Sequence, residues 1–372
     1  MKSNTRRIPY VNLSRQWLDE RDELLPIIDK VFESAQFVGG DELDKFEANI
    51  AKLCGTKYAC GLNSGTDALM LALVFCGVRK GDEVITPPNS FIASTAAIVH
   101  IGAIPVFVDV LPDQNIDPYK IEACITERTK AIMPVHLTGR MCDMDPIMDI
   151  ANKYGLAVIE DAAQSVGAKY KGKPSGSIGN VGCFSTHPLK NLNACGDGGF
   201  ITTNDEDIYN KSKSYRNHGM VNRNIIDHFG SVTRMDNLQA SILNYRLDKL
   251  EEVTQKRRNN AKSYLNSINN QDLFIPEEKA SEYNVYHTFV LQTKYRDELK
   301  EYLSKNGIDT AIHYPVPIHL QPAAKKLGYK VGSFPITEKQ SEEILTLPIN
   351  QYLTKVDLEK IAQVVNNFQN KA

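Results

Sequence analysis

The feature that most limits the possible folds is a regular alternation of short β-rich runs with helical patterns, which begins at residue 57. Strands are predicted at 57–62, 82–87, 104–110, 131–137 and 156–161, with helices between them at 66–75, 91–102, 117–125 and 144–155. Such alternation is typical of parallel strands joined by crossover helices. The strand runs are apolar nearly throughout, which indicates that helices cover both faces of the sheet. We therefore predict an α/β fold with a mostly parallel sheet.

The length of the chain, 372 residues, predicts two domains rather than one small core. A long helical pattern begins around residue 238 and bridges to a smaller mixed unit, which starts near 270 and contains a β-rich run at 286–293 and a Pro-rich stretch at 313–322. We place a large domain with an N-terminal arm at 1–245. A small C-terminal α+β domain is expected at 246–372.

Charge and hydropathy exclude several classes of partner. The formal net charge is −2 and no long basic run occurs, so we expect no nucleic acid partner. No apolar stretch reaches the roughly 18 residues that span a bilayer, and the start MKSNTRRIPYVNL lacks the apolar core of a signal peptide, so we expect a cytoplasmic protein without a membrane partner. The seven cysteines form no CxxC pair and are expected to be reduced and structural, Cys195 included. No metal site is predicted.

Polar residues gather where the predicted strands end, and ligands of open parallel sheets bind at these carboxyl ends. Asp161 closes the run LAVIED, where it serves either as a shielded carboxylate that needs a cationic partner or as the N-cap of a following helix. Gly65 and Thr66 open a helix whose free N–H groups form an anion site, although an ordinary capped helix begins in the same way. Ser185 offers a hydroxyl to the same anion. Phe91 either lies flat against an aromatic ligand or belongs to the core.

Lys190 lies in STHPLKNLNACGDGG, residues 185–199, two residues after Pro188 and ahead of three glycines. Most lysines are solvated charges, but the proline and the glycines make this turn tight and hold the side chain at a strand-end crevice. A pinned, partly desolvated lysine has a lowered pKa and becomes an amine nucleophile. An amine, a carboxylate, an anion site and an aromatic ring together fit pyridoxal 5′-phosphate, whose ring nitrogen Asp161 would keep protonated.

Four motifs, NSGTDAL, EDAAQS, CFSTHPLKNLNACGDGG and TRMDNLQASIL, resemble in order and spacing the DegT/DnrJ/EryC1/StrS family of sugar aminotransferases. The resemblance extends from about residue 11 to about residue 350. It implies a fold-type I, pyridoxal-phosphate-dependent transferase that forms a homodimer with its active sites at the subunit interface.

Matched position by position, the resemblance implies that Lys190 binds the cofactor covalently as a Schiff base and that Asp161 pairs with the pyridine nitrogen. It assigns the other cofactor contacts to five residues: Gly65, Thr66 and Ser185 at the phosphate, Phe91 on the ring, and Gln164 beside the ring oxygen. The run GSVTR departs from the family pattern, because Val232 stands where an Asn reaches the phosphate from the neighbouring subunit. Asn222, Arg223 and Asn224 are the candidates to replace that Asn.

The implied reaction moves an amino group from an amino acid, L-glutamate in similar proteins, to a keto sugar. For substrate contacts the resemblance indicates His187, Arg216, Asn217 and His319, although both histidines fit a structural loop role as well. The motifs are similar to those of members that act at C3 of nucleotide-linked sugars more than at C4, in amino-sugar biosynthesis for surface polysaccharides such as lipopolysaccharide or for secondary metabolites. A keto-octulosonate or an aminocyclitol ketone stays open as the acceptor.

Two further classes stay open. Another fold-type I enzyme, such as a carbon–sulfur lyase, would share the cofactor but need no keto acceptor. A non-catalytic binding or regulatory protein would keep the pocket without the reaction, which the presence of both Lys190 and Asp161 disfavours. Sugar dehydratases of this fold carry histidine in place of the lysine, so Lys190 argues against that branch.

Overall fold

A seven-stranded central sheet organises the computed structural model, which describes residues 7–369. Its strand order is β1-β9-β8-β5-β4-β2-β3. The bounds are β1 (Tyr58–Leu62), β2 (Glu83–Thr86), β3 (Ile104–Phe107), β4 (Thr129–Ile132), β5 (Ala157–Asp161), β8 (Val181–Ser185) and β9 (Gly199–Thr203). Only β9 runs against the others, since it pairs antiparallel with both β1 and β8. The predicted α/β fold with a mostly parallel sheet is confirmed.

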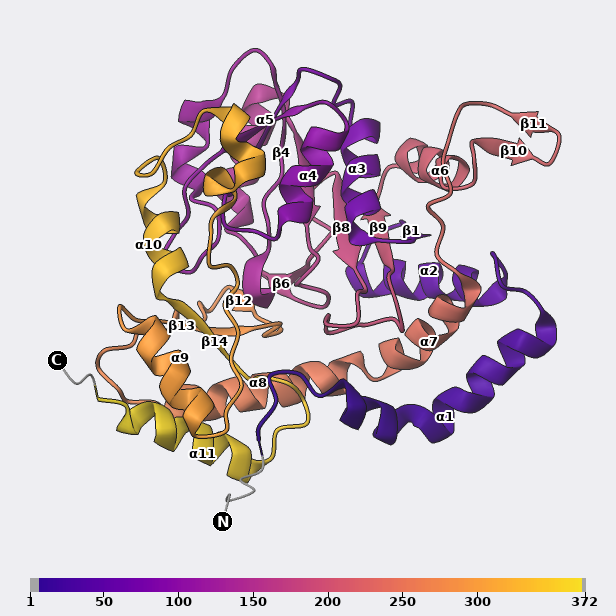
Figure 1. Ribbon diagram of the computed structural model, residues 1–372. Coiled ribbons are helices and arrows are strands. Elements are labelled where there is room, and N and C mark those ends of the chain that lie inside the picture. The colour runs from indigo at the N-terminus through magenta and orange to yellow at the C-terminus, as the bar shows by residue number, and fades with distance from the viewer. Residues whose placement is uncertain (1–6, 370–372) are drawn as a thin grey trace.

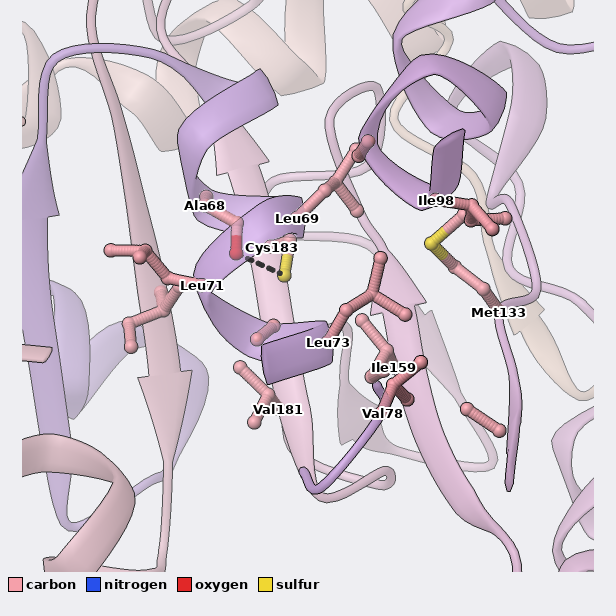
Figure 2. Close-up of a cluster of buried hydrophobic side chains, with 14 of the residues drawn as sticks. Ala68, Leu69, Leu71, Leu73, Val78, Ile98, Met133, Ile159, Val181 and Cys183 are labelled. Carbon is pink, nitrogen blue, oxygen red and sulfur yellow. Dashed lines mark hydrogen bonds between the residues drawn. The ribbon is translucent and has the colours of Figure 1, made fainter. Parts of the chain in front are cut away.

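Helices cover both faces of the sheet, as the apolar strand runs indicated (Figure 1). One face packs against α3 (Gly65–Phe75), α4 (Ile92–His100) and α6 (Glu206–Tyr215), and the other against α2 (Asp41–Cys54), α5 (Met144–Tyr154) and α7 (Asn237–Asp248). Figure 2 shows Leu69 and Leu73 of α3 among side chains of the sheet such as Ile159. Burial of these apolar side chains holds the start of α3 against the end of β8.

The C-terminal part of the chain has an apolar cluster of its own. Residues of α8 (Leu250–Ser267), β13 (Phe289–Gln292), α9 (Arg296–Lys305), β14 (Ile344–Leu347) and α11 (Lys355–Asn367) share it with Ile8 of the N-terminal segment. The proposed boundary between 245 and 246 falls inside α7, and the division into two domains stays a prediction. A small sheet joins the two parts of the chain: β12 (Glu282–Tyr283) pairs with β6 (Lys169–Tyr170), which also pairs with β7 (Lys173–Pro174). The C-terminal part also contains η4 (Ile318–Leu320), η5 (Pro322–Leu327) and α10 (Pro335–Glu343).

Two segments lie at the periphery of the ribbon in Figure 1. The N-terminal helix α1 (Leu13–Ser34) packs along α7 at the edge of the molecule. The hairpin of β10 (Met220–Asn222) and β11 (Ile225–Ile226) projects beyond α6. Both segments expose large apolar side chains on the surface of the subunit.

Two predicted helices differ from the structure. The segment 117–125 forms two 3₁₀ turns, η1 (Pro118–Lys120) and η2 (Glu122–Cys124), because only Ile121 among its central residues is fully buried and no apolar stripe supports a longer helix. A further 3₁₀ turn, η3, covers Leu137–Gly139. The long pattern from 238 to 268 is interrupted at Lys249, so that α7 and α8 meet at a break.

Over residues 7–369, no helix combines the length and the apolar character that a bilayer-spanning segment needs. The prediction that the N-terminal segment MKSNTRRIPYVNL is not a signal peptide falls partly on residues 1–6, which lie outside the described residues.

Candidate active site

A cavity of about 380 Å³ opens where β1, β5 and β8 end at one edge of the sheet. This volume falls within the range of small-molecule sites. The structure brings to its wall all seven residues expected to contact the cofactor, together with His187. They are Gly65, Thr66, Phe91, Asp161, Gln164, Ser185 and Lys190.

Asp161 ends β5 with a buried carboxylate that two hydrogen bonds hold in place. Its Oδ2 accepts a hydrogen bond from Ser94 Oγ at 2.6 Å, and its Oδ1 accepts one from the backbone N–H of Ala163 at 3.2 Å. No lysine, arginine or histidine in the described part of the chain forms an ion pair with it. Burial raises the pKa of Asp161, while the hydrogen bonds from Ser94 and Ala163 and the nearby charge of Lys190 oppose that rise. No helix begins at 162, so the N-cap interpretation is not supported.

The start of α3 forms a cradle beside the end of β8. Ser64 Oγ accepts the N–H of Asp67 at 3.1 Å, which leaves the first N–H groups of the helix, at Gly65 and Thr66, available for an anion. A Cβ atom on Gly65 would lie 2.8 Å from Ser185 Cβ. Glycine at this position therefore allows the helix to approach the strand closely enough for both to contact one small anion.

The turn that carries Lys190 is fixed by hydrogen bonds on both sides. Its backbone N–H donates to the carbonyl of His187 at 2.8 Å, and Asn193 Nδ2 donates to the carbonyl of Pro188 at 2.9 Å. Nδ2 of the next residue, Asn191, donates a hydrogen bond to the carbonyl of Val285 at 3.0 Å. Burial lowers the pKa of Lys190 to about 8, although the charge of Asp161 acts in the opposite direction. A larger share of this amine is therefore neutral and nucleophilic near neutral pH than for an ordinary lysine.

Phe91 and Gln164 complete the wall on the α4 side. Phe91 precedes α4, and its side chain is 54% exposed although it lines the cavity, which excludes the core alternative. An apolar ring left open in a cavity offers a stacking surface to a flat ligand. Gln164 is buried, its Oε1 accepts the N–H of Thr138 at 2.9 Å, and its side chain also forms a hydrogen bond with Tyr314 across the cavity wall.

The structure separates the four residues expected to contact substrate. His187 lines the cavity, whereas Arg216, Asn217 and His319 do not. Arg216 is paired with Glu47, Asn217 Oδ1 accepts a bond from Arg234, and His319 is buried with its Nε2 bonded to Glu338 Oε1 at 3.0 Å. Within one subunit these three side chains therefore have internal partners, and their contact with substrate stays a prediction.

Sequence reasoning missed the wall that the C-terminal part contributes: Arg257, His287, His313 and Tyr314. His287 Nδ1 lies 3.4 Å from Asn191 Oδ1, and burial, followed by the charges of Lys190 and Arg257, lowers the pKa of His287 well below its usual range. Burial likewise lowers the pKa of His313 to about 4. Both imidazoles are therefore neutral. The Pro-rich stretch was a signal for this wall, but His313 rather than His319 reaches the cavity.

The residues fit pyridoxal 5′-phosphate on the chemistry of the donors. A buried carboxylate without an ion-pair partner suits a protonated ring nitrogen, a helix start beside a serine suits a phosphate, and a lysine of lowered pKa suits an aldehyde. The open face of Phe91 suits the ring between them.

Comparison with known proteins agrees with this chemistry. Residues 19–367 match the model of the DegT/DnrJ/EryC1/StrS aminotransferase family. The chain is 42% identical to a dTDP-3-amino-3,6-dideoxy-alpha-D-galactopyranose transaminase of Aneurinibacillus thermoaerophilus over 97% of this chain and 99% of that one. It is also 42% identical to a "pleiotropic regulatory protein" of Geobacillus stearothermophilus, over 97% of this chain and 99% of that one. Among solved structures, DesV of S. venezuelae in complex with a ketimine intermediate superposes with a TM-score of 0.95 at 38% identity, covering 97% of this chain and 98% of that chain.

Proposed function

The chain belongs to the DegT/DnrJ/EryC1/StrS aminotransferase family, and from this premise we propose that it transfers the amino group of L-glutamate to a nucleotide-linked keto sugar. The protein is a pyridoxal-phosphate-dependent aminotransferase. The amino donor, the sugar and the carbon that is aminated are the proposed parts. Amination at C3 is favoured, because the sugar transaminase of Aneurinibacillus thermoaerophilus is named for a 3-amino product. Such a product would serve surface polysaccharide or secondary-metabolite synthesis.

The observation that carries the proposal is the presence of Asp161 and Lys190 in one cavity, Asp161 at the end of β5 and Lys190 in the turn after β8. When bound, pyridoxal phosphate supplies a carbon that carries the amino group and a ring that accepts the electrons of the breaking Cα–H bond. Asp161 would keep the ring nitrogen protonated. Gly65, Thr66 and Ser185 would hold the phosphate.

Lys190 would then act as the base and the acid of the reaction. With the donor bound in the cavity, Nζ of Lys190 would remove the proton from the donor Cα, hold it, and release it again. A pKa of about 8 suits both transfers near neutral pH, because the amine accepts and releases a proton with little free-energy difference. His287 and His313 remain neutral and so add no positive charge beside the lysine.

A half-reaction tests the proposal directly. Holoenzyme mixed with excess L-glutamate should convert to the aminated form of the cofactor, seen as a change of visible absorbance, and should release one equivalent of 2-oxoglutarate. Candidate keto sugars, with and without a nucleotide, are then screened for the ability to restore the original absorbance.

A nucleotide-free acceptor, such as a keto-octulosonate, would contradict the nucleotide-linked assignment. Release of ammonia without 2-oxoglutarate would indicate a lyase, and no conversion with any amino acid would favour the regulatory alternative that one relative's name supports.

We also propose a homodimer. Helix α1 exposes Trp17, Leu18, Leu25 and Phe32, and the hairpin region exposes Phe229 completely. Apolar side chains gathered in this way on projecting segments are typical of association surfaces. The hairpin of one subunit would then bring Asn222, Arg223 or Asn224 toward the cavity of the other, to supply the polar group that the apolar Val232 cannot offer to a phosphate. Sedimentation equilibrium should give twice the mass of the 41.6 kDa chain, and a monomer at micromolar concentration would contradict the proposal.

A further inference from the structure

Four arginines are buried in the described part of the chain, and one of them differs from the other three. Three form ion pairs with buried carboxylates: Arg140 with Glu282, Arg246 with Glu20, and Arg216 with Glu47. Arg257 is equally buried, at 6% exposure, yet no described carboxylate lies within ion-pair distance of it. A buried charge without a counter-ion is costly, so its retention calls for an anion from outside the chain.

The contacts of Arg257 satisfy only part of its donor capacity. Nη1 donates to the carbonyls of Tyr286 at 3.1 Å and His287 at 3.3 Å, and Nη2 donates to Gln351 Oε1 at 3.3 Å. Nε has no acceptor among residues 7–369. Every acceptor is neutral, so the guanidinium is held in place while its charge remains uncompensated. Burial lowers the pKa of Arg257 to about 10, which still leaves it protonated at neutral pH.

Arg257 lies on the lysine side of the active-site cavity. It lines the cavity itself, and it also lines a smaller adjoining hollow that includes Lys190 but not the cradle of Gly65, Thr66 and Ser185. The charges of Lys190 and Arg257 both lower the pKa of His287, which places the two cations around one imidazole. The uncompensated charge is therefore near the reacting amine and is separate from the expected phosphate position.

We propose that Arg257 binds the α-carboxylate of the amino donor, an inference that rests on the proposed function. The amino group of the donor must reach the position where Nζ of Lys190 reacts. The Cα atom of the donor carries both this amino group and the carboxylate. The carboxylate must therefore lie on the Lys190 side of the cavity, which is the side that the unpaired guanidinium lines. Since the keto group of a sugar brings no carboxylate to this position, Arg257 distinguishes amino donor from acceptor.

The test separates the donor from the acceptor and from the cofactor. In R257Q, the KM for L-glutamate in the first half-reaction should rise about 100-fold, as expected for the loss of a charged hydrogen-bonding partner. The KM of the keto sugar in the second half-reaction and the dissociation constant of pyridoxal phosphate should each change less than about threefold. An amine without an α-carboxylate, 4-aminobutanoate, should react equally slowly with wild type and variant.

A binding measurement provides a readout that needs no turnover. Calorimetric titration of the pyridoxal-phosphate form with 2-oxoglutarate should give a dissociation constant about 100-fold higher for R257Q than for wild type. R257K keeps a cation and is expected to lie between the two, and it replaces R257Q if that variant does not fold. Arg258, the next residue on α8, provides the matched control, because its guanidinium pairs with Glu278 at 2.7 Å and does not line the cavity, so R258Q should bind 2-oxoglutarate like wild type.

The outcomes are distinct. If R257Q and R257K bind 2-oxoglutarate and L-glutamate normally in an enzyme that transaminates, the assignment of Arg257 is overturned while the proposed function stands. If the same variants instead lose affinity for pyridoxal phosphate or for the keto sugar, Arg257 binds a phosphate and the assignment is again overturned. A wild-type enzyme that reacts with no α-amino acid overturns the proposed function, and the inference falls with it.

Discussion

Replacement of Lys190 by alanine should lower the rate of transamination by about 10⁴-fold or more and abolish the visible absorbance of the covalently attached cofactor. Nζ of Lys190 is the amine of lowered pKa in the cavity, and the proton transfer proposed for it has no obvious substitute, because His287 and His313 face the same space as neutral rings of low pKa. The rate is measured by release of 2-oxoglutarate from L-glutamate, and the absorbance by a spectrum of the dialysed protein.

A thermal shift separates this effect from a failure to fold. Because Asp161 and the α3 cradle remain, K190A should still be stabilised by added pyridoxal phosphate, although the ligand is now removable by dialysis. Alanine at the exposed Lys173 should leave spectrum and rate unchanged.

In the wild-type apoprotein, covalent capture of the cofactor should accelerate as the pH rises, with a midpoint near 8 rather than 10.5, because the neutral amine reacts. A coloured and active K190A protein would remove Lys190 from the mechanism.

The cofactor half of the site could be predicted from the sequence because local chemistry determines it. Asp161 ends an apolar strand, Gly65 begins a helix directly after another, and Lys190 follows a third within five residues. The ends of parallel strands must meet at one edge of a sheet, so three short motifs were sufficient to bring their side chains together. The strand order itself and the reversal of β9 are not contained in these motifs.

The substrate half of the site could not be predicted in the same way. Arg257 lies in the middle of α8, where the sequence indicates only a charged helix, and its role depends on the absence of a carboxylate partner, which is a property of the packed structure. His313 and His319 are six residues apart in one Pro-rich stretch, and the backbone between them decides which ring enters the cavity. Contacts between segments far apart in the chain leave no periodic signal. The segment 117–125 shows the corresponding limit for secondary structure, since its apolar residues do not share one buried face.

Replacement of Asp161 by asparagine should change activity and stability in opposite directions. Without the carboxylate, the ring nitrogen of the cofactor loses the group that keeps it protonated, and kcat should fall about 10²- to 10³-fold, as for the loss of a preorganised charged partner. Asparagine keeps the shape, because its oxygen can accept the N–H of Ala163 and its amide can donate to Ser94 Oγ. The apoprotein of the variant, in contrast, should melt at a higher temperature than wild-type apoprotein at pH 7. Differential scanning calorimetry of both apoproteins measures this difference.

The sign of the stability change follows from the direction of the pKa shift. Burial raises the folded-state pKa of Asp161 above its unfolded value of 3.8, so the folded protein binds the proton more tightly than the unfolded chain does. The wild-type apoprotein therefore loses stability as the pH rises from below 3.8 through the raised pKa, where the buried carboxyl must ionise without an ion-pair partner, and D161N avoids that loss. The difference in melting temperature should disappear at low pH, where both side chains are neutral. It should also reverse at pH 7 with pyridoxal phosphate present, because the protonated ring nitrogen would supply the missing charge.

Asparagine at the exposed Asp248 should alter neither rate nor melting temperature. A D161N apoprotein that is less stable than wild type at pH 7 would mean that the carboxylate is already neutralised within the chain, and the site would then lack the uncompensated charge from which the cofactor was inferred.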